Sequence, residues 1–188
     1  IAGLTGIGTL SLTLNQARIA NRHKREAMTD ALTGLLNRRA LLQNPSDTVP
    51  AGTALVAMDL DYFKTINDRF GHDCGDQALK AFAELIRANI RPTDLAARMG
   101  GEEFCIVVSD QNPHEPKAMA ERIRAQVEAM TIPTAAGPIR TTVSAGISYA
   151  SGDETLQSLL IRADEALYEA KSEGRNRIRT SDLDSLAA

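Results

Sequence analysis

The chain has 188 residues, 43% of them hydrophobic and 24% charged, which is typical of one soluble domain with a short appended element. This composition excludes disorder, a collagen-like chain and a multi-span membrane protein as descriptions of the whole. The net charge of −3 indicates no general nucleic-acid-binding surface, and we expect no nucleic-acid polymer as a partner. Cys74 and Cys105 are too few for a disulfide scaffold and lack the spacing of a metal site, so we expect both to be reduced.

The start of the chain is uncharged through residue 17, and a basic cluster follows at residues 18–25. Residues 15–28 contain no Pro or Gly, which predicts a lead-in helix. The uncharged stretch followed by basic residues fits two interpretations: the end of a transmembrane helix with its cytoplasmic flank, or a soluble amphipathic helix. The stretch is too short to span a membrane by itself, and we assign residues 1–27 to an N-terminal helix outside the main domain.

The first half of the main domain begins with a turn at Gly34, after which Asn37 is placed to cap a short helix through residue 42. Residues 44–52 contain two prolines and predict a loop. The apolar run at residues 53–60 predicts a buried strand. A short helix is expected at residues 63–70, and an amphipathic helix at residues 76–91 before Pro92.

The second half continues with two strands, at residues 95–98 and 104–108, joined around Gly100-Gly101 in the manner of a hairpin. Further elements are predicted as a helix at 115–130, a strand at 139–150, a helix at 155–172 and an edge strand at 177–179. This order predicts one α+β domain over residues 28–180, followed by a loose tail at 181–188.

Acidic residues gather at two predicted turns. Asp59-Leu60-Asp61 ends the buried strand, and Glu102-Glu103 follows the glycine pair. If the two corners meet in space, they provide oxygen ligands for Mg²⁺, which commonly takes one or two carboxylates together with substrate phosphates. The alternative for either corner alone is a set of solvated turn residues.

Four stretches in order resemble one known family. They are DALTGLLNRR at 30–39, DLDYFKTINDRFGHDCGD at 59–76, GGEEF at 100–104 and ADEALYEAKSEGRN at 163–176. Together they resemble the opening motif, the DxDxFKxxND block, the signature and the closing motif of the GGDEF diguanylate cyclases, with GGEEF as a variant of the signature. The resemblance extends from about residue 28 to residue 180.

The resemblance implies both a fold and a reaction. The fold is similar to nucleotidyl cyclase and polymerase palm domains, with a central, mostly antiparallel sheet surrounded by helices. The reaction condenses two GTP into cyclic di-GMP and two pyrophosphates, as each 3′-hydroxyl attacks the α-phosphate of the other GTP. Because one domain holds one GTP, the resemblance also implies a catalytic homodimer.

The resemblance assigns metal and catalytic roles at the two acidic corners. Asp59, Glu102 and the Leu60 carbonyl would bind Mg²⁺, or Mn²⁺ in its place, and such a pair of metals can stabilise both attacking and leaving oxygens. Glu102 and Glu103 are alternative bases for the 3′-hydroxyl. Lys64 would stabilise charge that develops on the phosphates.

Substrate binding is implied for a second set of residues. Asn67 and Asp76 would contact guanine, whose N1–H and 2-amino donors adenine lacks. Gly100 and Gly101 would let the backbone approach the nucleotide. Lys171 and Arg175 would hold the triphosphate, or alternatively sit favourably at a helix end. The resemblance also places His72 and Phe63 at the nucleotide, with capping or core positions as the alternative for His72 and a core position for Phe63.

A second ligand site is implied by Arg91 and Asp94, which form an RxxD motif five residues ahead of the glycine pair. This register matches the family's inhibitory site for cyclic di-GMP, and Arg122 resembles the further arginine often found there. Arginine forks suit the phosphates and guanine edges of such a ligand.

The main hypothesis is thus a Mg²⁺-dependent, product-inhibited diguanylate cyclase, with a non-catalytic receptor of GTP or cyclic di-GMP as the alternative. The family implies a cytoplasmic catalytic domain with a sensor or membrane segment upstream, which would anchor the full-length protein at the inner membrane.

Overall fold

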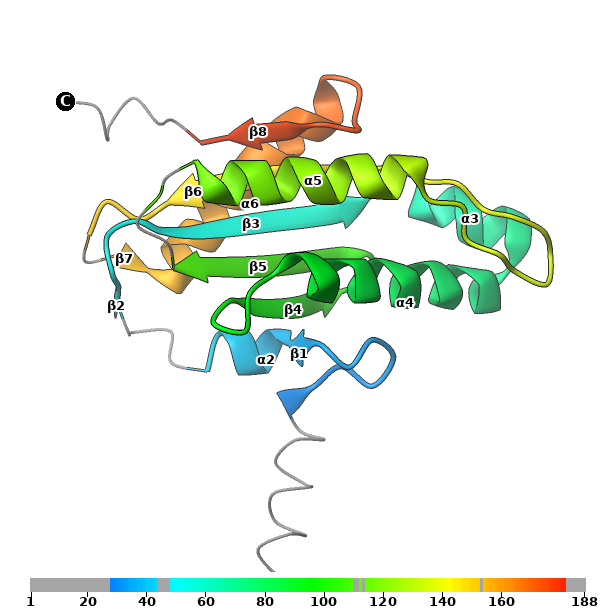
Figure 1. Ribbon diagram of the computed structural model, residues 1–188, viewed down its shortest axis with the longest axis horizontal. Helices are drawn as coiled ribbons and strands as arrows, with labels where there is room; N and C mark the ends of the chain where they lie inside the picture. The colour runs from blue at the N-terminus through cyan, green and yellow to red at the C-terminus, as the bar shows by residue number, and fades with distance from the viewer. Residues whose placement is uncertain (1–27, 44–47, 110–111, 113, 153, 182–188) are drawn as a thin grey trace, which may run out of the picture.

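The computed structural model describes residues 28–43, 48–109, 112, 114–152 and 154–181. A six-stranded sheet in the order β1-β4-β5-β3-β6-β8 forms its centre (Figure 1). The strands are β1 (Leu36–Asn37), β3 (Thr53–Leu60), β4 (Leu95–Gly100), β5 (Glu103–Ser109), β6 (Val143–Tyr149) and β8 (Ile178–Thr180). The central pairings are antiparallel and the two outermost pairings are parallel, so the sheet is mixed around the predicted antiparallel centre.

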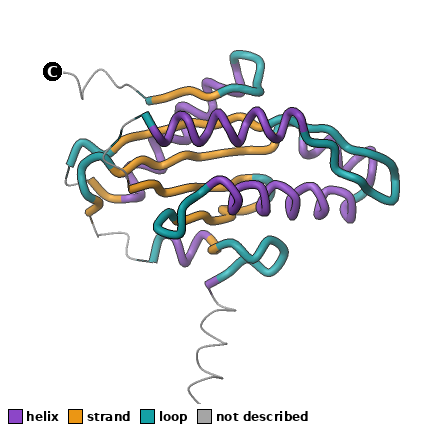
Figure 2. The backbone as a smooth tube through the Cα atoms, in the orientation of Figure 1, coloured by secondary structure: helices purple, strands orange, loops and turns teal. Residues whose placement is uncertain are grey.

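Helices cover both faces of the sheet (Figure 2). In Figure 1, α4 (His72–Asn89) and α5 (Glu115–Ala129) cross one face, and α6 (Leu156–Ser172) lies behind the sheet. The short α3 (Phe63–Phe70) packs on α4, and α2 (Arg38–Leu41) shares the core of α6. The predicted α+β architecture, a sheet surrounded by helices, is confirmed.

Strand β3 explains why two cores form. All eight of its residues are buried, because helices cover both faces. Val56 and Met58 belong to the core beneath α4 and α5, whereas Leu55 and Ala57 belong to the core beneath α6, as the two-residue repeat of a strand requires. The apolar run predicted as a buried strand is therefore the central element of the domain.

Strand β6 and helix α6 approach closely at Gly146. A Cβ atom there would overlap the carbonyl oxygen of Ala163 and the amide nitrogen of Leu167. The contact requires glycine because α6 packs its backbone directly on the strand. This packing holds the C-terminal end of α6 near the end of the sheet where β3 ends.

Several boundaries differ from the prediction. Helix α4 begins at His72 rather than residue 76, because Gly71 turns the chain at a φ of 85° and its carbonyl accepts the N–H groups of Cys74 and Gly75. The helix ends at Asn89, since Ile90 is already extended ahead of Pro92. Strand β6 is shorter than predicted, and Ile139 instead forms an isolated bridge with Ile132.

Three very short strands were not predicted. Besides β1, they are β2 (Thr48–Val49) and β7 (Glu154–Thr155), which pair with each other apart from the main sheet. The predicted loop at 44–52 therefore contains a strand. The capping prediction is confirmed, since the Asn37 side chain accepts the Ala40 N–H at 2.9 Å.

The N-terminal lead-in helix and its membrane interpretation lie outside the described residues, as does the tail beyond Ser181. Within the described ranges, no helix combines the length and the apolar composition that crossing a membrane requires.

Candidate active site

The two acidic corners meet at one end of the sheet. Asp59 lies opposite Glu103 in the antiparallel pairing of β3 with β5, and opposite Ser144 in the pairing of β3 with β6. The Leu60 N–H points to the Glu102 carbonyl oxygen at 3.4 Å. The pairing of two central strands therefore brings together carboxylates that are more than 40 residues apart in the chain.

The glycine pair forms a strained turn between β4 and β5. Gly100 and Gly101 have φ values of 149° and 50°, which favour glycine. Arg98 holds this turn, because its guanidinium donates two hydrogen bonds to the Gly101 carbonyl at 2.9 and 2.7 Å. The same guanidinium pairs with the Asp30 carboxylate at 3.2 Å. The opening motif is thus connected to the signature turn, a role for Arg98 that sequence reasoning missed.

The charge of Asp59 is balanced by one cation. Its side chain is only 7% exposed, and its Oδ2 lies 2.8 Å from the Lys171 ammonium at the end of α6. Burial raises the pKa of the Asp59 carboxyl to about 6; Lys171 opposes this shift, and the charges of Glu102 and Glu103 add to it. The raised pKa thus reflects first the burial of the carboxyl, and a cation bound beside Asp59 would favour its ionised form.

The donor set at this corner suits a hard divalent cation. Within the described ranges, no group of three or more His, Cys, Asp or Glu residues is arranged to hold a metal ion by itself. Mg²⁺, however, needs only one or two carboxylates when backbone and phosphate oxygens complete its shell. Asp59, Glu102 and the Leu60 carbonyl fit that requirement.

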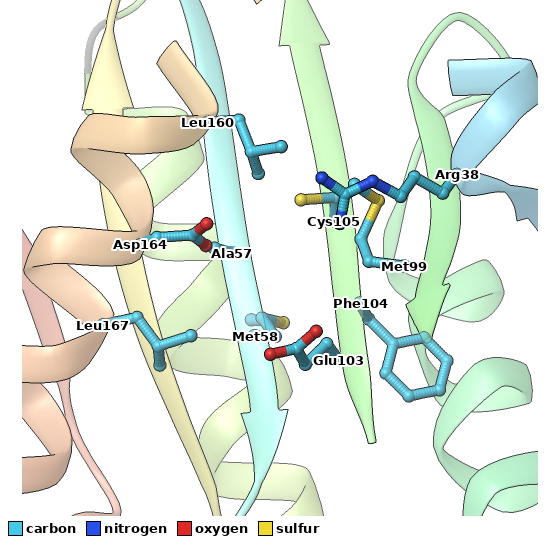
Figure 3. Close-up of a pocket in the computed structure, with 10 residues that line it drawn as sticks. All are labelled: Arg38, Ala57, Met58, Met99, Glu103, Phe104, Cys105, Leu160, Asp164 and Leu167. Atoms are coloured by element: carbon cyan, nitrogen blue, oxygen red, sulfur yellow. The ribbon is translucent and has the colours of Figure 1, made fainter. Parts of the chain in front are cut away.

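A small cavity of about 30 Å³ lies behind the corner, between α6 and the sheet. Figure 3 shows the carboxylates of Glu103 and Asp164 pointing toward it, with Arg38 reaching in from α2. Partial burial and the nearby Glu103 raise the pKa of the Asp164 carboxyl, while Arg38 and Lys171 oppose the shift. Arg38 and Asp164 belong to the opening and closing motifs, yet sequence reasoning assigned them no role.

Cys105 also lines this cavity, and burial raises the pKa of its thiol. It and Cys74 are buried free thiols. Neither has the exposed, electropositive surroundings of a reactive cysteine.

The residues assigned to the nucleoside lie on α3 and α4. Asn67 is half-buried, whereas Lys64, His72 and Asp76 are exposed. His72 lies in the first turn of α4 with its side chain exposed, which contradicts its core alternative. Phe63 is buried in the main core at 7% exposure, in agreement with the core alternative.

Gly75 explains how the Asn67 side chain is placed. A Cβ atom at residue 75 would overlap the Asn67 Oδ1 atom, so the carboxamide of α3 packs directly on the backbone of α4. Sequence reasoning missed this glycine, although it stands one residue before Asp76.

The closing motif places a second cation near the site. Arg175 follows α6 in a left-handed conformation with a φ of 64°. Its guanidinium lies over the Tyr62 ring at 4.7 Å, within the range of a cation–π contact. Lys171 and Arg175 are therefore near the ends of β3 and α6, although only Lys171 contacts a carboxylate of the acidic corner.

Arg91, Asp94 and Arg122 lie together at a different place. They line a cavity of about 150 Å³ between the end of α4 and the start of α5. The Asp94 carboxylate accepts the Arg91 backbone N–H at 2.8 Å, and Asn89 accepts from the Arg122 Nε at 2.9 Å. The Arg91 guanidinium is 3.8 Å from Glu115. The RxxD motif and the further arginine thus line one cavity, together with the carboxylate of Glu115.

Comparison with known proteins agrees with this arrangement. The family model described as "Diguanylate cyclase, GGDEF domain" matches residues 27–177. The response regulator PleD of Caulobacter vibrioides is 40% identical over 161 residues, which cover 81% of this chain and 36% of PleD. The chain therefore spans about a third of the length of that relative.

Solved structures give the same result. The coiled coil and GGDEF domain of DgcB from Caulobacter crescentus, in complex with c-di-GMP, aligns with a TM-score of 0.84 at 28% identity over 93% of this chain and 96% of that one. The active GGEEF domain of a diguanylate cyclase from Vibrio cholerae aligns with a TM-score of 0.65 at 32% identity, over 77% of this chain and 88% of that one.

Proposed function

This chain belongs to the diguanylate cyclase GGDEF-domain family, and on that premise we propose that it condenses two GTP molecules into cyclic di-GMP and two pyrophosphates. The observation that carries the proposal is the meeting of Asp59 with the Glu102-Glu103 corner at the ends of paired strands, beside the Lys171 ammonium. A buried carboxylate with a raised pKa, next to the half-buried ammonium of Lys171, suits a polyphosphate substrate with its metal. The GGEEF form of the signature is compatible with catalysis, since a relative with that form is described as active.

Asp59, Glu102 and the Leu60 carbonyl would hold Mg²⁺ or Mn²⁺. A bound divalent cation supplies charge stabilisation to the phosphates and the leaving oxygen. The chain's own contribution is to place carboxylates at two adjoining strand ends, where the β3–β5 pairing fixes their spacing. Glycines at residues 100 and 101 leave room for the nucleotide against the turn.

The remaining assigned residues bind and orient the substrate. Lys171 and Arg175 would neutralise the triphosphate, and Lys64 would stabilise charge on the phosphates as it develops. Asn67 and Asp76 would read guanine, with His72 at the edge of the same site. An acceptor carboxylate facing guanine rejects adenine, because adenine presents no matching donor pair.

The reaction requires two such sites. Each 3′-hydroxyl oxygen forms a bond to the α-phosphorus of the other GTP, the bond to pyrophosphate breaks, and the hydroxyl proton passes to a carboxylate, Glu102 or Glu103. Because each domain holds one GTP, we propose that two copies face each other as a homodimer. We place the domain in the cytoplasm, where GTP is available; membrane anchoring through residues 1–27, or by an upstream sensor, stays a prediction.

The decisive experiment incubates the purified protein with GTP and Mg²⁺ and separates the products by chromatography. We expect cyclic di-GMP and pyrophosphate from the wild type, and a loss of at least about a thousandfold in Glu102→Gln. Glu84→Gln, an exposed position on α4, is the matched control and should retain the wild-type rate. Binding of GTP or cyclic di-GMP without pyrophosphate release would instead identify a receptor.

We further propose product inhibition at the cavity of Arg91, Asp94 and Arg122. Arg91 and Arg122 line this cavity together with Asp94 and Glu115, and arginine forks suit a ligand with phosphates and guanine edges. Arg91→Ala should weaken binding of cyclic di-GMP by about tenfold or more in calorimetry, since a charge-assisted pair is lost. Lys80→Ala, an exposed position on α4, the helix that precedes Arg91, should bind as the wild type does. Equal affinity of Arg91→Ala and wild type would remove this claim.

A further inference from the structure

The buried carboxylate of Asp61 joins two parts of the chain that lie 115 residues apart. Asp61 follows β3 directly and is only 2% exposed. It accepts hydrogen bonds from the Thr142 hydroxyl at 2.6 Å, the Ser144 hydroxyl at 2.7 Å and the Asn176 backbone N–H at 3.0 Å. Both carboxylate oxygens are therefore engaged by donors within the protein.

This engagement separates Asp61 from its neighbour Asp59. The sequence offers both as one acidic corner, but three donors occupy Asp61, whereas the Asp59 carboxylate pairs with the Lys171 ammonium. A cation at the corner would have to displace hydroxyl and amide donors to reach Asp61. Asp61 therefore holds the Asn176 backbone, whereas Asp59 stays available to a cation.

Strained backbone gathers around this carboxylate. Within the described part of the chain, the non-glycine residues with positive φ are Tyr62 at 57°, Arg175 at 64° and Asn176 at 48°. Tyr62 is the next residue after Asp61, and Asn176 is its hydrogen-bond partner. Left-handed conformations of such residues cost free energy and persist where surrounding contacts hold them, which is common at functional sites.

The turn that carries Arg175 is fixed from three sides. The Arg175 N–H bonds to the Ala170 carbonyl at the end of α6, at 3.0 Å. The Asn176 side chain bonds to Arg124 and Glu128 of α5, at 2.7 and 2.9 Å. The Asn176 backbone N–H donates to Asp61, and this bond, together with the Arg175–Tyr62 ring contact, links the turn to the end of β3. Figure 1 shows the α6–β8 turn at the same end of the sheet as the end of β3.

We propose that Asp61 is a positioning residue for triphosphate binding. By holding the Asn176 amide, it sets the left-handed turn so that the Arg175 guanidinium lies beside the strand end that carries Asp59. The phosphate-binding cation and the metal-binding carboxylate then keep a fixed spacing. The inference rests on the proposed triphosphate role of Arg175.

The test is a double-mutant cycle read by calorimetry with a non-hydrolysable GTP analogue and Mg²⁺. Asp61→Ala and Arg175→Ala should each weaken binding by about tenfold. The double variant should bind within about twofold of Arg175→Ala, because a misplaced arginine and an absent one are equivalent. Additive losses would overturn the proposal, since they would indicate that the two residues act independently.

Two further variants separate positioning from other roles. Asp61→Asn keeps one oxygen for Thr142 and Asn176, and its amide can donate to Ser144, so affinity should stay within about threefold of wild type. A loss as large as that of Asp61→Ala in a folded Asp61→Asn protein would point to a metal ligand and overturn the proposal. Ser144→Ala is the matched control, because it removes one buried bond to Asp61 and leaves the Asn176 bond; its affinity should not change.

Hydrogen exchange, measured in the absence of nucleotide, tests whether Asp61 anchors the Asn176 backbone. The amide of Asn176 should exchange at least about tenfold faster in Asp61→Ala than in wild type or Ser144→Ala. If Asp61→Ala does not fold, Asp61→Ser replaces it in the calorimetry and in the exchange measurement. The serine side chain is too short to reach Asn176, so the same bond is lost. Unchanged exchange would overturn the inference. A wild type that binds no GTP analogue would instead overturn the proposed function, while the exchange result would still decide the anchoring.

Discussion

The Asp59 carboxylate lies in surroundings that disfavour its negative charge. Its carboxyl is buried, it faces two further acidic residues, and it has one ammonium within hydrogen-bond distance. Such a group lowers the stability of the free protein and favours the binding of positive charge. Such an arrangement is typical of a functional site, where a charged group that favours ligand binding lowers the stability of the folded protein.

The buried Asp59 carboxyl predicts a pH-dependent difference in stability between the wild type and Asp59→Asn. The pKa of Asp59 is raised from 3.8 to about 6, so the folded state retains the proton that the unfolded state releases. The free energy of unfolding should therefore lose the Asp59 contribution as the pH rises from about 4 to about 6. Asp59→Asn lacks this loss, and without divalent cations it should be more stable than wild type above about pH 6, with the difference vanishing near about pH 4.

Urea unfolding at several pH values, in the presence of a chelator, measures this difference. Asp68→Asn, an exposed position on α3, controls for the removal of an aspartate charge. A lower stability of Asp59→Asn than of wild type at neutral pH would contradict the assignment, since it would mean that Lys171 more than offsets the cost of burial.

At this scale the sequence predicts the residues of the short motifs but not those that act through distant partners. Asp59, Glu102 and Lys171 stand in motifs with a resemblance to a known family, and the structure brings them to one corner. Arg98 and Asp61 act through Asp30 and Asn176, which are 68 and 115 residues away. Such pairings depend on strand register and on the path of α6, and no local pattern encodes them.

At the scale of elements, the contact of α3 with α4 positions the residues assigned to guanine. Asn67 lies on α3 and packs on the bare backbone of α4 at Gly75, next to Asp76. The two helices therefore act as one unit at this end. The sequence predicts both helices, yet not that α4 starts early enough to include Gly75, because its first turn is built by backbone bonds to Gly71.

Gly75→Ala should therefore separate stability from binding. Alanine is favoured over glycine inside a helix by about 0.5–1 kcal/mol. The added methyl group would overlap the Asn67 Oδ1 atom and lie 3.1 Å from the Phe63 ring. Because the carboxamide can turn away and the ring needs only a small shift, the change in stability should stay within about 1 kcal/mol. The added methyl group should displace the Asn67 carboxamide and weaken binding of a GTP analogue by about tenfold. Calorimetry and thermal unfolding measure the two effects.

Gln77→Ala, an exposed substitution two residues further along α4, is the control and should bind as wild type does. Full affinity in a folded Gly75→Ala protein would exclude Asn67 from nucleotide binding. A large loss of stability would instead show that the two helices cannot adjust to one methyl group.

Over the whole molecule, the same elements connect the two proposed ligand sites. Helix α4 begins at His72, four residues ahead of Asp76, and ends two residues ahead of Arg91; its 18 residues span about 27 Å. Strand β4 then returns from Leu95 to Gly100 at the signature turn. The register of RxxD with the glycine pair is thus set by the length of one strand, which is why a sequence spacing predicts it.

Catalysis by facing copies predicts a specific result when variants are mixed. If each bond of the product needs the carboxylates of both copies in one dimer, a dimer with one Glu102→Gln copy forms no cyclic di-GMP. Random exchange of subunits in an equimolar mixture should then reduce the rate per wild-type chain to about half, and a ninefold excess of Glu102→Gln should reduce it to about a tenth.

A chain that acts alone would keep its rate at every mixing ratio. An equal excess of an unrelated protein, which cannot exchange subunits, is the control and should leave the rate unchanged. Initial rates of pyrophosphate release across mixing ratios therefore measure whether the catalytic unit is one domain or two.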